Sequence, residues 1–91
     1  MKEAITQKLM ETFSAEYVHV VDDSAKHKSH RPDSENSHFN ILIVSQAFDG
    51  LSLVKRHRLL YDALDPFIQK GVHALQLKPL TCIEFEEIVN G

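Results

Sequence analysis

The chain has 91 residues, of which 43% are hydrophobic and 25% are charged, and its formal net charge is -3. These values are typical of one small globular domain over residues 1–91 that buries a single core. The negative balance disfavours a protein devoted to nucleic acid, because such proteins usually carry net positive charge. The single cysteine, Cys82, excludes an internal disulfide and suits a reducing compartment.

Membrane insertion, export and catalysis find no support in the sequence. No apolar run is long enough to cross a membrane, and residues 1–7 lack the apolar core of an export signal. The chain also contains no phosphate-cradling glycine loop, no H-E-x-x-H zinc motif and no convincing pairing of a nucleophile with a base. We therefore expect a cytoplasmic protein that is not an enzyme.

The first predicted elements are a helix and two strands. The helix covers residues 2–13, where apolar side chains recur at the spacing of one helical face, namely Ile5, Leu9 and Phe13. Residues 16–22 and 37–45 alternate apolar and polar side chains, which is the period of a strand. His19 and His38 fall on the polar faces of these strands and are expected on the same open face of the sheet.

A long loop is predicted between the two strands. Residues 23–36 are polar, contain Pro32 and show no hydrophobic period. Loops of this length are often functional. Within the loop His27 and His30 have H-x-x-H spacing, and neutral imidazole is a good ligand for iron, zinc or copper. The plainer interpretation is two solvated loop histidines, and the spacing alone favours it.

Two further helices are predicted in the second half. Ser52 is the expected N-cap of a helix over residues 53–64. The core stripe of this helix is expected to consist of Leu53, Leu60 and Leu64. Asp65-Pro66 has the pattern of an N-cap followed by proline at the first helical position, and it predicts a second, short helix that Gly71 ends.

The remaining chain predicts a third strand and a last helix. Residues 72–78 form the strand, with His73 on the same face as the next two leucines, which is the face to be covered. Thr81 and Glu84 have capping-box spacing and start a helix over residues 82–89. The order is αββααβα. A small sheet must cover its apolar face, so the prediction is an α+β, two-layer fold with the helices on one side.

Residues 48–61 and 72–75 carry the most specific pattern of the chain. They read F-x-G-x-x-x-x-x-R-H-R-x-x-Y and then, after a short gap, V-H-A-L. This pattern resembles the signature of the BolA family. The resemblance extends upstream through Asp22-Asp23-Ser24, His27 and Ser37-His38-Phe39, so that it covers most of the chain. It implies a KH-like (class II) fold with a three-stranded mixed sheet.

The resemblance also implies a function. In BolA-like proteins the V-H-A-L histidine, here His73, is a ligand to a [2Fe-2S] cluster shared with a monothiol glutaredoxin. A second ligand, His or Cys, comes from the loop between the first two strands. The loop here has no cysteine, so the resemblance assigns His27, or else His30, and the glutaredoxin supplies one cysteine and one glutathione thiolate. The expected role is an adaptor or regulator in cluster assembly, trafficking or iron regulation. Without the resemblance, His73 would more simply be a partly buried histidine bonded to backbone.

Residues 55–58 form a basic turn that suggests a second possible function. Lys55, Arg56 and Arg58 are expected to fan out to solvent, where they could contact phosphate or an acidic partner. BolA-like proteins have been linked to DNA binding, so the alternative is a DNA-binding transcriptional regulator. KH domains, however, clamp nucleic acid with a G-x-x-G loop, and this region has only Gly50. The plainest interpretation is a charged outer face, and the free protein is expected to be an apo monomer.

Overall fold

The computed structural model describes residues 1–24 and 38–91. Its elements, in chain order, are α1 (Lys2–Phe13), β1 (Tyr17–Asp22), β2 (His38–Val44), the 3-10 helix η2 (Gln46–Phe48), α2 (Leu53–Gln69), β3 (Ala74–Leu80) and α3 (Cys82–Asn90). The α+β class and the three-stranded mixed sheet predicted from the sequence are confirmed.

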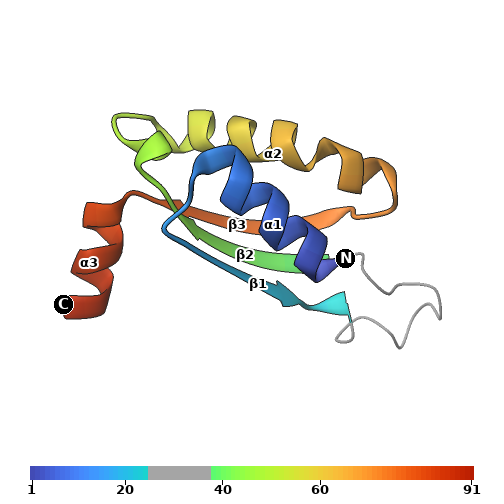
Figure 1. Ribbon diagram of the computed structural model, residues 1–91, viewed down its shortest axis with the longest axis horizontal. Coiled ribbons are helices and arrows are strands. Elements are labelled where there is room, and N and C mark those ends of the chain that lie inside the picture. Colours follow the sequence, from blue (N-terminus) through green and yellow to red (C-terminus); the bar gives the residue numbers. More distant parts are fainter. Residues whose placement is uncertain (25–37) are drawn as a thin grey trace.

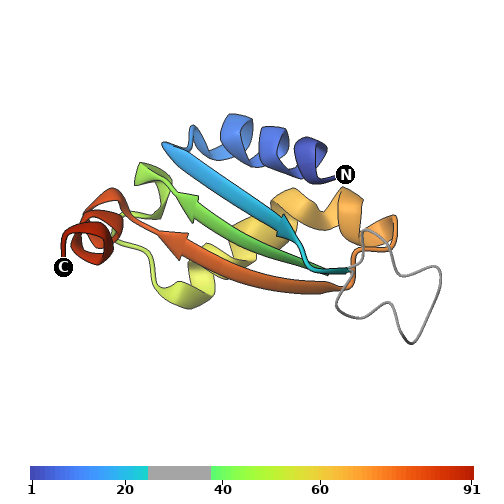
Figure 2. The same cartoon turned by 90° about the horizontal axis from the view of Figure 1, so that it is seen from below.

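The sheet has the order β1-β2-β3, with β1 antiparallel and β3 parallel to the central strand β2. Ile41 at the centre of β2 lies opposite Val20 on one side and Leu77 on the other. Helices α1 and α2 cover one face of this sheet, whereas α3 stands beyond the ends of the strands (Figure 1). Seen from below, the three strands lie side by side and their other face is open (Figure 2).

The core fills the space between the sheet and the two covering helices. The predicted α1 stripe is buried in full, and α2 contributes Leu60 and Leu64. The sheet contributes alternate residues of its strands, which are Val20, Phe39, Ile41 and Ile43. The alternation leaves His19 and His38 on the opposite, open face, as predicted.

Ser45 fastens the end of α1 to the turn after β2. This serine is fully buried, and its Oγ donates to the Phe13 carbonyl at 2.7 Å while accepting from the Ala47 backbone N-H at 3.0 Å. The Phe13 and Phe48 rings pack beside it with their centres 5.4 Å apart. A buried hydroxyl is stable only with such partners.

The prediction of two helices over residues 53–71 is wrong. The chain forms one helix, α2, that contains Pro66 in its interior, so Asp65 is not an N-cap. Proline removes one backbone hydrogen bond from a helix. Phe67 and Ile68 pack against the core, and their burial compensates for that loss. The helix ends at Gln69, just before Gly71, whose φ of 119° suits glycine.

The buried face of α2 also differs from the prediction. Leu53 is 63% exposed, and Arg56 takes the place expected for it. The spacing explains the change, because Arg56, Leu60 and Leu64 are four residues apart and lie on one helical face. The third strand begins later than predicted, at Ala74, because buried Val72 closes the turn from α2.

Candidate functional site

The beginnings of β2 and β3 lie side by side at one end of the sheet. The register places the Cα of His38 opposite that of Ala74, so His73 lies next to this pair. The end of β1 reaches the same place, since Asp22 is opposite Phe39. Three stretches named by the sequence pattern therefore meet here, although up to about fifty residues separate them in the chain.

Ser24 holds the backbone of His38 in position. The residue is 2% exposed, and its Oγ accepts a hydrogen bond from the His38 backbone N-H at 3.1 Å. The Asp23 backbone N-H donates to the His38 carbonyl at 2.8 Å. Hydrogen bonds from Ser24 to the Asp22 carboxylate hold the pKa of Asp22 below its usual value. The Asp-Asp-Ser stretch therefore anchors the first residue of β2 from two sides.

His73 presents an exposed imidazole at this end of the sheet. The expectation that its side chain lies on the covered face is wrong, because the strand alternation begins only at Ala74. Its Nδ1 is 3.1 Å from the Gly71 carbonyl, which can only accept, so in the neutral ring Nδ1 carries the proton and Nε2 the lone pair. A backbone carbonyl that fixes one ring nitrogen in this way is the usual support of a metal-binding histidine.

The ring of His38 contacts the ring of His73. Their centres are 4.9 Å apart and their planes form an angle of 73°. The two histidines border a hollow of about 280 Å³ that Asp23, Asn40 and Tyr61 help to line. From the sequence, His38 is expected to be a structural or surface residue on the open face. Its pairing with His73 depends on the parallel register of β2 and β3, which sequence patterns do not give.

The predicted loop ligands, His27 and His30, lie outside the described residues. Within residues 1–24 and 38–91, no group of three His, Cys, Asp or Glu side chains is placed to hold a metal ion. The described part of the chain therefore supplies at this end a pair of imidazoles rather than a complete metal-binding set.

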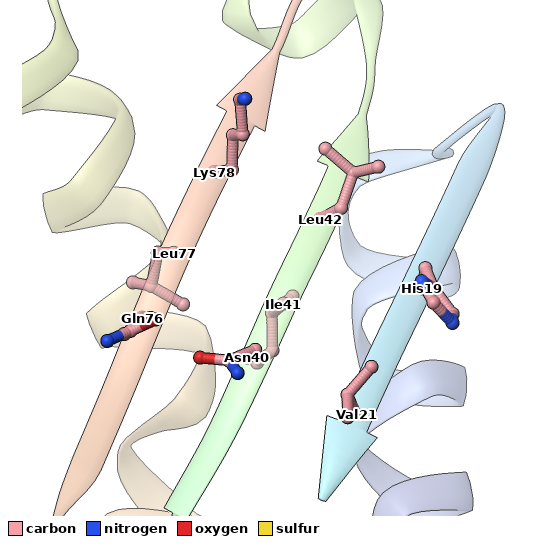
Figure 3. Close-up of a pocket in the computed structure, with 8 residues that line it drawn as sticks. All are labelled: His19, Val21, Asn40, Ile41, Leu42, Gln76, Leu77 and Lys78. Carbon is pink, nitrogen blue, oxygen red and sulfur yellow. The ribbon is translucent and has the colours of Figure 1, made fainter. Parts of the chain in front are cut away.

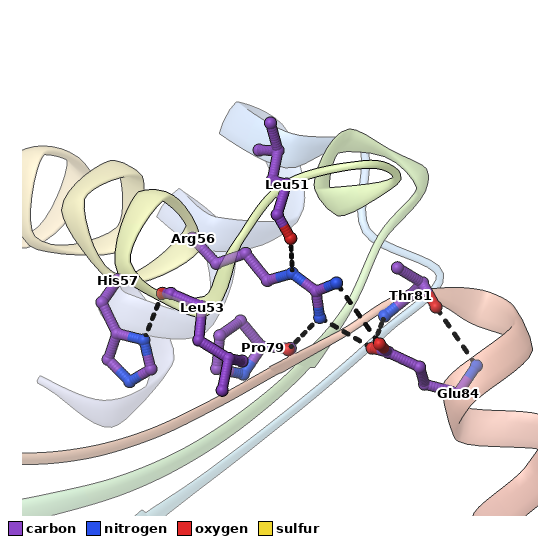
Figure 4. A network of polar contacts seen from close by, with 7 residues as sticks. All are labelled: Leu51, Leu53, Arg56, His57, Pro79, Thr81 and Glu84. Atoms are coloured by element: carbon purple, nitrogen blue, oxygen red, sulfur yellow. Dashed lines mark hydrogen bonds and ion pairs between the residues drawn. The ribbon is translucent and has the colours of Figure 1, made fainter.

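The expectation that Arg56 extends into solvent is wrong. Its residue exposure is 7%, and its guanidinium donates to the carbonyls of Leu51 at 3.0 Å and Pro79 at 3.1 Å (Figure 4). It also forms a two-pronged ion pair with Glu84, at 2.7 and 3.3 Å. This arginine is occupied inside the protein, where it joins α2, β3 and α3.

Glu84 completes the junction with α3. The Thr81 side chain accepts from the Glu84 N-H at 3.1 Å while a Glu84 oxygen accepts from the Thr81 N-H at 2.9 Å, which confirms the predicted capping box. The Arg56 guanidinium, followed by the Thr81 N-H, holds the pKa of Glu84 below its usual range. None of the residues of α3 is itself buried, so these polar contacts and the stacking of Phe85 on Tyr17 hold the helix.

The other residues of the basic turn have different surroundings. Lys55 and Arg58 are exposed, as predicted. His57 is half-buried, with its Nδ1 2.8 Å from the Leu53 carbonyl of the preceding turn. Only two of the three predicted cations therefore remain available to a partner.

The open sheet face carries a second hollow. It measures about 400 Å³ and lies around Leu42, with polar side chains on all three strands (Figure 3). Its other lining residues are His19, Val21, Asn40, Ile41, Gln76, Leu77 and Lys78. The lining mixes apolar and polar side chains, with Val21 on the edge strand β1 and Asn40 on the central strand β2.

Cys82 lies at the opposite end of the sheet from His73, separated from it by the whole of β3 (Figure 1). A hydrogen bond with the Glu16 carboxylate raises the pKa of the Cys82 thiol, and partial burial adds to this effect. A raised pKa disfavours the thiolate that a metal needs. No described helix has both the length and the apolar character of a membrane span.

Comparison with known proteins gives a consistent result. The family model of BolA-like proteins matches residues 9–84. The DNA-binding transcriptional regulator BolA of Escherichia coli (strain K12) is 36% identical over 86 residues, which cover 94% of this chain and 80% of that protein.

Two plant matches concern one type of protein. The SufE-like protein 1 of Arabidopsis thaliana is 41% identical over 86 residues, which are 88% of this chain but only 23% of that protein. The solved BolA domain of SufE1 from Arabidopsis thaliana is similar with a TM-score of 0.83 and 41% identity, covering 91% of this chain and 93% of that one. The fold described above is therefore also found as one domain of a longer protein.

Proposed function

Since the chain belongs to the family of BolA-like proteins, we propose that it is a cytoplasmic adaptor that binds a monothiol glutaredoxin and shares a bridging [2Fe-2S] cluster with it. His73 is one ligand, and His27 or His30 is the other. The glutaredoxin contributes a cysteine and a bound glutathione. The adaptor acts in cluster assembly, trafficking or iron regulation.

The observation that supports this proposal best is the setting of His73. Its imidazole is exposed, and the Gly71 carbonyl fixes the tautomer that directs the Nε2 lone pair outward. An adaptor that shares a ligand set across an interface needs a ligand of this kind at its surface, because the partner must reach the same ion. Buried ligands would suit a resident metal instead.

The loop that carries His27 and His30 is joined in the chain directly to Ser24, which lies beside His38. Two residues of chain lie between Ser24 and His27. Histidine in place of thiolate on an iron raises the reduction potential and makes ligation depend on pH. This chain's part would be to supply two neutral imidazoles and hold their orientation.

The proposal can be tested by anaerobic titration of the protein into a cluster-loaded monothiol glutaredoxin, followed by visible absorption and circular dichroism. We expect the spectrum to change up to a one-to-one ratio. His73→Asn should abolish that change, since the imidazole is lost while the exposed site remains polar. His19→Asn, which removes an exposed histidine from β1, is the matched control and should behave as the unmodified protein.

Two outcomes would contradict the proposal. One is a spectral change that His73→Asn leaves intact. The other is the absence of any change in the unmodified protein while size-exclusion chromatography shows that the two proteins associate. The second outcome would indicate docking without cluster sharing.

A second candidate function is a DNA-binding regulator, favoured by the name of the Escherichia coli relative, DNA-binding transcriptional regulator BolA. In this chain Lys55 and Arg58 would contact phosphate, since both are exposed on α2. Binding should weaken steeply with salt and drop in a Lys55→Ala/Arg58→Ala variant. A DNA affinity that changes neither with salt concentration nor on removal of these two cations would exclude this function.

A further inference from the structure

We propose that two copies of this chain form a weak symmetric dimer, in which the free end of α3 from each copy lies on the open sheet face of the other. The proposal concerns the chain alone and does not rest on the proposed cluster function. A protruding helix end and a row on the sheet that can receive it are both present on the same molecule.

Helix α3 protrudes with apolar side chains exposed to water. It starts beyond the strand ends and points away from α1 and α2, so it is seen almost end-on from the open face (Figures 1 and 2). Ile88 and Val89, near its free end, are 56% and 63% exposed, and no residue of the helix is buried. An isolated helix of nine residues is only marginally stable. A second contact would therefore stabilise α3 while it removes these two side chains from water.

The open sheet face carries a row of side chains that matches this helix end. The strand register places His19, Leu42 and Lys78 side by side across the three strands. All three line the hollow of about 400 Å³ on this face (Figure 3). Neighbouring strands lie about 4.8 Å apart, so the two outer residues of the row are separated by about 10 Å, which is close to the diameter of a helix. A helix end that rests on Leu42 therefore has a nitrogen-bearing side chain on either side.

The two surfaces also carry opposite charge. Glu86 and Glu87 are exposed on α3, directly before the apolar pair. Lys78 is exposed on the sheet. When the apolar pair of one copy lies on the leucine of the other, the two carboxylates come near this cation. Charge pairs at the margin of an interface contribute to its orientation more than to its affinity.

Symmetry favours a second copy as the occupant of the open face. Each copy gives one helix end and receives one, so the contact is made twice and association stops at two. At 1.5 Å per residue α3 is about 13 Å long, which is enough to bridge the roughly 10 Å between two packed sheets. The contact is small beside a standard interface of about 1,600 Å², so the dimer is weak. The concentrated protein is then a dimer rather than the monomer expected from the sequence.

Sedimentation equilibrium of the full chain, at protein concentrations from about 10 μM to about 1 mM, tests this inference. The average mass should rise from 10.4 kDa toward twice that value. Val89→Lys should weaken dimerisation at least about tenfold, because it places an ammonium group in the apolar contact and close to Lys78. Val54→Lys is the matched control and should dimerise as the unmodified protein does. Val54 is 62% exposed but lies on α2, on the other side of the sheet.

Charge reversal tests the pairing itself. Lys78→Glu should weaken the dimer, and its combination with Glu86→Lys and Glu87→Lys should restore it. All three positions are exposed, so the variants should fold, which circular dichroism checks. A mass that stays at 10.4 kDa over the whole concentration range would overturn the inference. Equal weakening by Val54→Lys and Val89→Lys would do the same, as would a combined charge reversal that restores nothing.

Discussion

Arg56→Met should destabilise the fold far more than the same change two residues away, at Arg58. Methionine keeps most of the aliphatic stem of Arg56, so the substitution removes mainly the charge and its hydrogen bonds. Arg58 is exposed on the same helix and is the matched control.

The magnitude follows from the partners that Arg56 leaves behind. The Pro79 carbonyl loses the donor at 3.1 Å in a buried position, which costs about 1–3 kcal/mol. The Leu51 carbonyl is only partly buried and adds about 0.5–1 kcal/mol. The Glu84 side chain is 42% exposed and can turn to water, so the ion pair adds no more than about 1 kcal/mol. We therefore expect a loss of about 2–4 kcal/mol, against about 0.5 kcal/mol or less for Arg58→Met.

Urea unfolding followed by circular dichroism measures this difference. With an m value of about 1–1.5 kcal/mol/M, the midpoint of Arg56→Met should fall by roughly 1.3–4 M. Arg56→Lys should be intermediate, because an ammonium keeps the charge but cannot form the fork to Glu84. Equal midpoints for Arg56→Met and Arg58→Met would refute the reasoning, since Arg56 would then be no more than a surface cation.

Three further predictions concern side chains away from the histidine pair. Ser45→Ala should cost about 1–3 kcal/mol of unfolding free energy, because the buried Phe13 carbonyl loses its donor; a thermal melt that matches the unmodified protein would contradict this. Glu84, whose pKa is lowered from 4.5 in the folded state, stabilises the protein above pH 4.5, and this contribution is lost as the pH falls through the folded pKa. The advantage of the unmodified protein over Glu84→Gln in urea should therefore be present at pH 7 and shrink as the pH falls below 4.5; a gap that stays the same from pH 7 down to the acid limit of folding would be the wrong result. Alkylation of Cys82 by iodoacetamide at pH 8 should be slow and should accelerate in Glu16→Gln, because the neighbouring carboxylate that raises the thiol pKa is gone; equal rates would exclude that cause.

Local signals in the sequence predicted the local parts of the fold. The capping box at Thr81 and Glu84, the cap at Ser52 and the apolar stripe of α1 each depend on residues within a few positions of one another, and the structure confirms all three. Pro66 misled the prediction because its helix-starting pattern is also local. Burial of Phe67 and Ile68 against distant elements decided that region instead.

The site was harder to predict because its contacts are long-range. The pattern named His73 but gave neither its exposure nor its contact with His38, which lies 35 positions earlier. Arg56 was taken for a surface residue because a cation in a basic run usually is one. Its spacing of four from Leu60, and of eight from Leu64, is the signal that could have revealed its buried face. The pattern gave no signal for its acidic partner, Glu84, which lies 28 positions away in the chain.

The strand β3 begins beside His73 and ends beside Arg56, and at seven residues it is about 23 Å long. Groups so far apart affect each other's energetics little. A probe attached at the α3 end of the molecule should therefore leave the histidine end unperturbed. Ile83 is 68% exposed there, and a fluorophore attached at that position would report the tumbling of a complex while leaving the histidines undisturbed.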